Sequence, residues 1–464
     1  MKLSKKQIIG FALALLVLVG MNFFPTSEAL TVAGRNAIGI LITMLVLLVS
    51  EAIPIPVTCL VLPAFLVLFG CVPMRDAYSG FSNHIMFFVL ASFGISAAIT
   101  KVNLSRRMLI ALMNAFGGSV KTLLFAMMVC TALISSIVSN VATTAVFLPM
   151  LLDFLNIYSK ETDKKKTGQA FMIALPIASM IGGMMTPAGS SLNLLCIAQL
   201  ETLTGMTISF TQWMVFGIPI TLVILPISWW LVVKLNPPAE MSKESIAGYL
   251  STLTVSKKWD VKEKMTALIM AVMFVLWVLS SWFPYLQVTA IAIVGVGIMM
   301  FPKIEIFTWK EFEDSISWEA FFLLGAVMCV GNAIVATKAS TWLAAALVPA
   351  ALSLPVFFVL IITSLLVFVL LVPVPVAPAL IGMLAAPLVA LAVNTAISPI
   401  IMIMLLGLCV ANCYLLPLDT VPLITYMTGY YKMGQLAKTA LPHQIILTVL
   451  VAVWLPIAGM MLGI

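Results

Sequence analysis

The sequence predicts an all-α polytopic membrane protein of about eleven transmembrane helices in two inverted repeats, each with a re-entrant hairpin and a broken helix. The first observation is composition: the 464 residues are 62% hydrophobic and 9% charged, with a mean hydropathy of +1.18. Soluble globular proteins do not have this ratio, and at about 20 apolar residues per crossing the chain has room for about ten to twelve helices. The second observation is a polar cluster inside an apolar run, and the third is a pair of Gly/Pro breaks at corresponding places in the two halves.

The polar cluster lies in the run 131–149. Six hydroxyl or amide side chains crowd its middle: Ser135, Ser136, Ser139, Asn140, Thr143 and Thr144. The apolar flanks, 123–129 and 146–155, are each too short to cross a bilayer. In hydrocarbon every such polar group costs free energy unless protein, an ion or water satisfies it. We therefore predict a hairpin that enters the membrane and turns back, with its polar tip as a candidate binding site.

The basic residues predict the topology. If the N-terminus is cytoplasmic and both hairpins return to their starting side, all basic residues except Arg35, Arg75 and Lys338 fall in cytoplasmic loops. The positive-inside rule then supports eleven crossings of the cytoplasmic (inner) membrane and an external C-terminus. We read the lysines and apolar run at 1–20 as a retained first helix. The net charge of +7 reflects topology, so we expect the lipid bilayer and no nucleic acid as a partner.

Both halves follow the same order of elements. Each ends in a re-entrant hairpin and a helix interrupted at its centre, by 182–191 in the first half and by 416–422 in the second. Corresponding breaks of this kind point to a transporter site near the membrane midplane. We expect five parts: scaffold of repeat 1 (1–118), transport part of repeat 1 (119–235), cytoplasmic linker (236–264), scaffold of repeat 2 (265–340) and transport part of repeat 2 (341–464).

Four short stretches stand in a fixed order along the chain: 50–58 (SEAIPIPVT), 80–83 (GFSN), Ser139-Asn140 and 189–193 (GSSLN). Together they resemble the motifs of the divalent anion:sodium symporter family, the sodium-coupled dicarboxylate, citrate and sulfate carriers. The resemblance implies a homodimer in which a fixed scaffold holds a moving transport domain. That domain would contain both hairpins and both broken helices, and would slide like an elevator.

The resemblance also implies one sodium ion at the first hairpin. By position its ligands would be Ser135, Ser139, Asn140 and the carbonyl of Gly189. Hydroxyl, amide and backbone carbonyl oxygens are suitable ligands for a hard cation.

A small anionic substrate would bind beside this ion. Its carboxylate would meet Ser139, Asn140 and the half-helix that starts near Ser190, because free N–H groups and the positive dipole end of a helix favour an anion. Asn193 and Thr420 complete the expected substrate-binding set. The alternative is that these small polar residues only allow the helices to pack closely.

The second half departs from this pattern. When the hairpins are aligned on Pro149 and Pro387, the segment 377–379 (Ala-Pro-Ala) takes the place of the first signature and supplies no side-chain ligand. In the second break the terminal Asn of the motif is Leu423, and Asp419 stands where the family has a small residue. The resemblance therefore leaves a second sodium site without side-chain support.

Asp419 lies near the predicted membrane centre, where a charge costs about 2.5–3.5 kcal/mol on insertion scales. One interpretation is an N-cap for the half-helix that runs through Pro422. The other is a coupling carboxylate, which when ionised would repel an anionic substrate until a sodium ion or proton binds.

These features predict a secondary active transporter of small organic anions, mainly di- or other carboxylates, coupled to sodium or protons. An uncoupled anion exchanger and a carrier of inorganic oxyanions are the alternatives. The chain has no Walker loop and no metalloprotease or serine-hydrolase motif, and we read His84 as a helix-end residue and His443 as a loop residue. We therefore expect no enzyme activity and no cofactor beyond a co-transported sodium ion or proton.

Overall fold

The structure, a computed structural model, describes residues 4–116, 118–252, 258–340, 342, 354–374, 376–412 and 414–464. In these ranges every regular element is a helix, as the sequence predicted. Among the described residues, seven helices are long and apolar enough to cross a membrane, and six shorter apolar helices accompany them. The six described cysteines are free and buried, which agrees with their placement in apolar runs.

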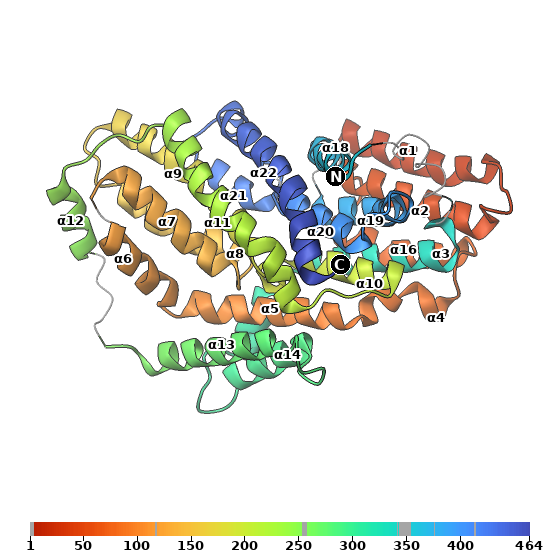
Figure 1. Cartoon of the computed structure of the whole chain (residues 1–464), viewed down its shortest axis with the longest axis horizontal. Helices are drawn as coiled ribbons and strands as arrows, with labels where there is room; N and C mark the ends of the chain where they lie inside the picture. The colour runs from red at the N-terminus through yellow and green to blue at the C-terminus, as the bar shows by residue number, and fades with distance from the viewer. Residues whose placement is uncertain are drawn as a thin grey trace.

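The regions that the sequence analysis assigned to the scaffold in the two halves pack against each other. In the first half they comprise α1 (Lys5–Gly20), α2 (Val32–Ser50), α3 (Ile55–Leu68) and α5 (His84–Lys101). In the second half they comprise α13 (Val261–Leu279), α14 (Val288–Met299) and α16 (Trp318–Ala336). Helix α16 packs on α3, and α14 packs on α5 (Figure 1). The first predicted hairpin and broken helix follow: α7 (Val120–Ser135), α8 (Asn140–Leu155), α9 (Glu161–Gly183), the short turn η3 (Pro187–Gly189), α10 (Ser191–Thr204) and α11 (Phe210–Leu235).

The second half repeats this order. Its elements are α18 (Val356–Leu370), α19 (Ala377–Asn394), α20 (Pro399–Val410), α21 (Thr420–Tyr426) and α22 (Met433–Leu462). Of the predicted transport part 341–464, residues 341, 343–353, 375 and 413 lie outside the described residues. The second break is longer than the first, because nine residues separate α20 from α21.

The two broken helices exchange partners between the halves. Helix α10, the part of the first broken helix that follows the break, packs on α19 of the second hairpin and on α20. Helix α21, the corresponding part of the second, packs on α8 of the first hairpin and on α9. Each break therefore lies next to a hairpin of the opposite half.

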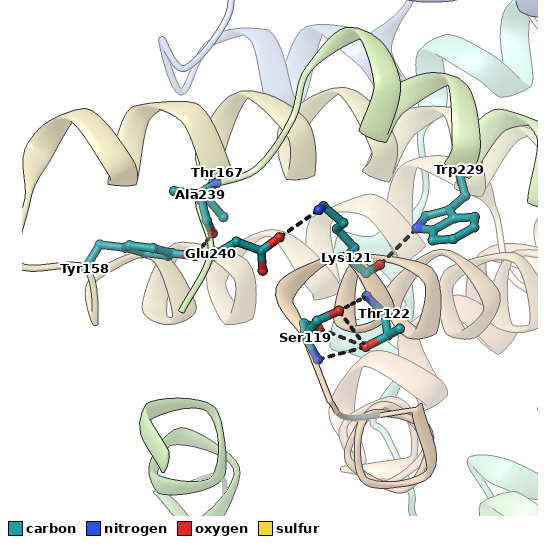
Figure 2. Close-up of polar contacts among 8 residues, drawn as sticks. All are labelled: Ser119, Lys121, Thr122, Tyr158, Thr167, Trp229, Ala239 and Glu240. Atoms are coloured by element: carbon teal, nitrogen blue, oxygen red, sulfur yellow. Dashed lines mark hydrogen bonds and ion pairs between the residues drawn. The ribbon is translucent and has the colours of Figure 1, made fainter. Parts of the chain in front are cut away.

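The first residues of the predicted linker are attached to the first hairpin region (Figure 2). The Tyr158 hydroxyl donates to the Ala239 carbonyl at 2.9 Å, and the Ala239 N–H donates to the Thr167 hydroxyl at 3.1 Å. Glu240 forms an ion pair of 2.7 Å with Lys121 at the start of α7. After α12 (Lys243–Thr252), α13 begins at Val261, inside the range predicted as linker.

Five further short elements complete the described secondary structure. These are η1 (Met21–Phe23), α4 (Met74–Ala77), η2 (Ser79–Ser82), α6 (Leu104–Phe116) and α15 (Trp309–Ser315). Helix α15 is attached to α5 through an ion pair of 2.6 Å between Lys101 and Glu311.

Candidate functional site

The tip of the first hairpin is built by a helix end and a capped helix start. Helix α7 ends at Ser135, and α8 begins at Asn140. Ser139 caps α8, since its Oγ accepts a hydrogen bond from the Ala142 N–H at 3.3 Å. A serine at this position has its side-chain oxygen available for the free N–H groups of the first turn. The polar sequence 135–140 therefore forms the predicted turn.

Four oxygens converge beside this turn. The Ser135 hydroxyl donates to Asn140 Oδ1 at 2.7 Å, and the Ser179 hydroxyl on α9 donates to the Asn140 carbonyl at 2.9 Å. The Ser135 and Ser179 Oγ atoms are 3.1 Å apart. Either hydroxyl can be the donor in this third contact. Each hydroxyl has one hydrogen, so four oxygens share two hydrogens, and a cation would stabilise the surplus lone pairs.

Three glycines bring the first break against this hairpin. A Cβ at Gly182 would lie 2.3 Å from the Ala132 carbonyl oxygen, and one at Gly183 would lie 2.3 Å from Asn140 Oδ1. A Cβ at Gly189 would lie 2.9 Å from the Ser135 carbonyl oxygen. The backbone of the break is therefore in direct contact with the hairpin tip and with Asn140 Oδ1.

The half-helix α10 starts next to the cluster. Ser190 caps it, accepting from the Leu192 N–H at 3.3 Å. The Asn193 side-chain amide donates to the carbonyls of Gly183 at 2.7 Å and Thr186 at 2.9 Å. It therefore links the start of α10 to the backbone of the break. Its Oδ1 is buried and has no hydrogen-bond partner among the described residues.

The hydroxyls of Thr143 and Thr144, in the first turn of α8, are likewise buried and unpartnered among the described residues. Ser136 has another role: its carbonyl accepts a hydrogen bond from the Thr186 hydroxyl, and its own hydroxyl donates to the Leu133 carbonyl at 2.7 Å. The break and the hairpin are thus joined by side-chain as well as backbone contacts.

The second-half candidates lie on a different element. Asp419 is the N-cap of α21, accepting from the Val421 N–H at 3.0 Å, and Thr420 begins the helix with an exposed side chain. Helix α21 approaches the first hairpin region by packing on α8 and α9. The structure brings Ser135, Asn140 and Gly189 together directly, whereas the hydrogen bond of Asp419 goes to its own helix.

Sequence reasoning missed two buried polar residues. Ser179 belongs to the oxygen cluster, and its spacing of four residues from Gly183 on one helix face was a usable signal. Asn412, in the second break, has its amide nitrogen 2.8 Å from Met184 Sδ and 2.7 Å from the Leu408 carbonyl. Met184 follows α9 directly, so Asn412 joins the second break to the first.

Solved membrane transporters share this architecture. MtrF from Neisseria gonorrhoeae, described as one of a class of antimetabolite efflux pumps, superposes with a TM-score of 0.56 at 13% identity, covering 98% of this chain and 94% of that one. The YdaH transporter of Alcanivorax borkumensis gives 0.57 at 14% identity, covering 99% and 98%. At such low sequence identity the similarity shows a shared fold alone.

Comparison with sequence relatives identifies the protein family. A protein of Staphylococcus saprophyticus described as the sodium-dependent dicarboxylate transporter SdcS is 26% identical over 465 residues, covering 93% of this chain and 87% of its own. The SdcS of Staphylococcus aureus strain USA300 is 30% identical over 234 residues, 49% of this chain and 45% of its own. The model of the sodium:sulfate symporter transmembrane region matches residues 5–464. With both hairpins and both breaks in place, the chain belongs to the sodium:sulfate symporter family, the divalent anion:sodium symporters, and is a multi-pass membrane transporter of small anions.

Proposed function

We propose that this protein is a secondary active transporter that carries dicarboxylates across the cytoplasmic membrane together with sodium. The observation that carries the proposal is the oxygen cluster at the first hairpin, where two hydroxyl hydrogens serve three oxygen–oxygen contacts. The sodium-dependent dicarboxylate transport described for the SdcS relatives gives the same pairing of ion and substrate.

The sodium ion lies between the hairpin and the first break. Ser135 and Asn140 provide side-chain oxygens, Ser139 and the carbonyl of Gly189 complete the predicted set, and Ser179 adds one hydroxyl from α9. All are uncharged oxygens, which suit a hard monovalent cation and leave its positive charge available to an anion.

The substrate binds where that charge meets the start of α10. One carboxylate lies at Ser139, Asn140 and Ser190, close to the free N–H groups of the half-helix. The unpartnered Oδ1 of Asn193 is available to the bound water or ion, and Thr420 contacts the far end of the substrate. Neither the hairpin tip nor the break contains Lys or Arg, so the anion depends on the sodium for its counter-charge.

Transport follows an elevator scheme. Both hairpins and both broken helices move as one body, held together by the exchanged packing of α10 and α21. The scaffold helices stay fixed and form a homodimer. The N-terminus is cytoplasmic and the C-terminus is external, as the distribution of basic residues predicts.

A cation-independent anion exchanger is the second candidate. It is favoured by the first turn of α19, where 377–379 is Ala-Pro-Ala and offers no side-chain oxygen for a second ion. Proteoliposomes loaded with unlabelled succinate separate the two candidates. An exchanger takes up labelled succinate equally well with sodium or choline outside, whereas a symporter requires sodium.

The first prediction concerns ligand binding by the purified protein. Because a ligand that binds only the folded state stabilises it by mass action, succinate should raise the melting temperature in sodium buffer and much less in choline buffer. At succinate about 100-fold above its Kd the stabilisation is about 2.7 kcal/mol. Citrate and sulfate tested alongside define the anion class. Absence of a shift with every anion in both salts would contradict the proposed function.

The second prediction concerns Asp419. Asn and Asp cap helices about equally well, so Asp419→Asn removes the charge while keeping the cap of α21. If the carboxylate couples cation and anion binding, the variant loses the sodium or pH dependence of succinate uptake. Asp153→Asn, which neutralises an exposed carboxylate near the end of α8, serves as the matched control. Uptake of Asp419→Asn with unaltered dependence on both ions would exclude the coupling role.

A further inference from the structure

A second cavity, separate from the site at the first hairpin, is formed by residues of the second half alone. It is a groove of about 400 Å³ between α18 and α22, two helices that pack on each other (Figure 1). Its lining includes Phe368 and Val369 from α18, Leu415 from the second break, and Leu441, Gln444 and Ile445 from α22. This volume lies in the range of about 300–1,000 Å³ that is usual for small-molecule sites.

The chemistry of the groove suits a hydrocarbon chain. All of its described lining residues are apolar except Gln444, which is 4% exposed and whose side-chain amide donates to the Asn412 carbonyl at 3.4 Å. A charged solute would lose its hydration in the groove without gaining hydrogen-bond partners, which is unfavourable. The groove is therefore not suited to the transported anion.

The groove opens onto the face of α22 that contacts lipid. Leu441 and Ile445 are about half exposed at its rim, and Val449 and Val453 continue the same face at intervals of four residues. Because α22 is one of the apolar helices long enough to cross the membrane, acyl chains cover this face. Val369, on the α18 wall, is 65% exposed. The groove is thus continuous with the lipid-facing surface, and an acyl chain can enter it sideways from the bilayer.

A lysine lies at one end of this face. Lys438 is exposed and precedes Leu441 by three residues, so it lies on the same side of α22, about 10 Å along the helix axis from Ile445. One leaflet contributes about 15 Å of hydrocarbon. With the Lys438 ammonium at the membrane surface, the groove therefore lies inside the leaflet in which α22 begins.

The charge of Lys438 has no carboxylate to balance it on the neighbouring helices. Helices α11, α18 and α20 pack on α22, and the described residues of these four helices include no Asp or Glu. The phosphate of a lipid head group would supply the missing negative charge, since lysines next to the membrane surface attract anionic lipids. The choline or ethanolamine cation of a zwitterionic lipid would find no partner on these helices.

We propose that an anionic phospholipid, such as phosphatidylglycerol, binds here, with one acyl chain in the groove between α18 and α22 and its phosphate at Lys438. The groove reaches Leu415 in the second break and Val372 at the tip of the second hairpin. The bound chain therefore supports both elements, and the lipid stabilises the folded protein by mass action. This inference does not depend on which anion is transported.

Native mass spectrometry and thermal unfolding of the delipidated full-length protein in detergent test this proposal. Titration with palmitoyl-oleoyl phosphatidylglycerol should show one lipid retained with higher affinity than any further ones. It should also raise the melting temperature more than the phosphatidylcholine with the same acyl chains. Lys438→Gln should weaken this binding about fivefold, the effect of one lysine at an anionic membrane surface. Val369→Trp fills the groove and should remove the retained lipid.

Two control variants make the same changes away from the groove. Lys264→Gln replaces an exposed lysine in the first turn of α13, and Val294→Trp replaces a valine on α14 that is 60% exposed. Both should bind phosphatidylglycerol as the wild type does. Inorganic phosphate, which has no acyl chain, should leave the melting temperature unchanged.

Several results would overturn the lipid site. Equal affinity of the wild type, Lys438→Gln and Val369→Trp would show annular lipid only, and equal retention of phosphatidylcholine would remove the role of the head group. No retained lipid in the wild type, or stabilisation by inorganic phosphate alone, would contradict the role of the groove. If Val369→Trp does not fold, Leu441→Trp fills the groove from the α22 wall and decides instead. None of these measurements uses succinate, so their outcome is separate from that of the proposed transport function.

Discussion

Replacement of Asn140 by leucine is expected to reduce sodium-dependent succinate uptake by at least about 100-fold. Asn140 is 8% exposed and provides the oxygens that accept from Ser135 and Ser179. Leucine removes Oδ1, so a buried hydroxyl loses its partner at a cost of about 1–3 kcal/mol, and the ion loses a ligand. The combined loss of about 3 kcal/mol corresponds to the 100-fold effect, at 1.4 kcal/mol per factor of ten. Uptake into proteoliposomes and the sodium-induced shift in melting temperature measure it.

A control variant and a milder variant accompany this experiment. Asn394→Leu makes the same change at an exposed position at the end of α19 and should retain uptake. Ser179→Ala removes one oxygen of the cluster and should weaken sodium binding without abolishing it, at about 1.4 kcal/mol or tenfold. If Asn140→Leu transported succinate at the wild-type rate, the binding site would have to lie elsewhere.

Substitution of Gly182 by alanine should destabilise the protein by at least about 1–3 kcal/mol, the usual cost of overpacking, and should also impair uptake. The added Cβ would lie 2.3 Å from the Ala132 carbonyl oxygen and 2.5 Å from its Cα. These are backbone atoms of α7, so no side-chain rotation relieves the overlap, and α9 must move away from the hairpin. The melting temperature in detergent measures the loss of stability. The shift of that temperature on adding sodium measures the effect on the ion site.

Gly297→Ala provides the matched control. Gly297 lies in α14, and a Cβ there would meet no atom within 4 Å. Alanine is a better helix former than glycine by about 1 kcal/mol, so this variant should melt at the same or a higher temperature. Equal melting temperatures for both alanine variants would show that the approach of α7 to α9 is looser than the structure describes.

The hairpin tip and the first break were predictable because the signal is local. Polar residues inside an apolar run must be satisfied in the membrane, and a run with glycines at 182, 183 and 189 around Pro187 interrupts a helix, so 135–140 and 182–191 stood out. Capping of α8 by Ser139 follows from the same local chemistry. The whole architecture could be predicted because the second half repeats this pattern.

Ser179 was missed, and the reading of His443 as a loop residue was wrong, because it lies buried inside α22; the two failures have different physical reasons. Ser179 meets Ser135 across 44 positions of sequence, and only the tertiary approach at Gly182 and Gly183 brings them together. His443 follows Pro442, which in water would end a helix, whereas α22 continues through this proline. Neighbouring helices in a membrane protein can satisfy the backbone group that a proline leaves free, so proline was an unreliable boundary signal there.

The exchanged packing of the half-helices has a consequence for biogenesis. Chains are synthesised and inserted from the N-terminus, but α10 lies against α19 and α20, and α21 lies against α8 and α9. The packing around the first-half site therefore stays incomplete while the ribosome translates the next two hundred or so codons. During that interval the faces of α8, α9 and α10 that the second half covers meet lipid or insertion machinery, so a truncated product should be recognised by membrane quality-control proteases.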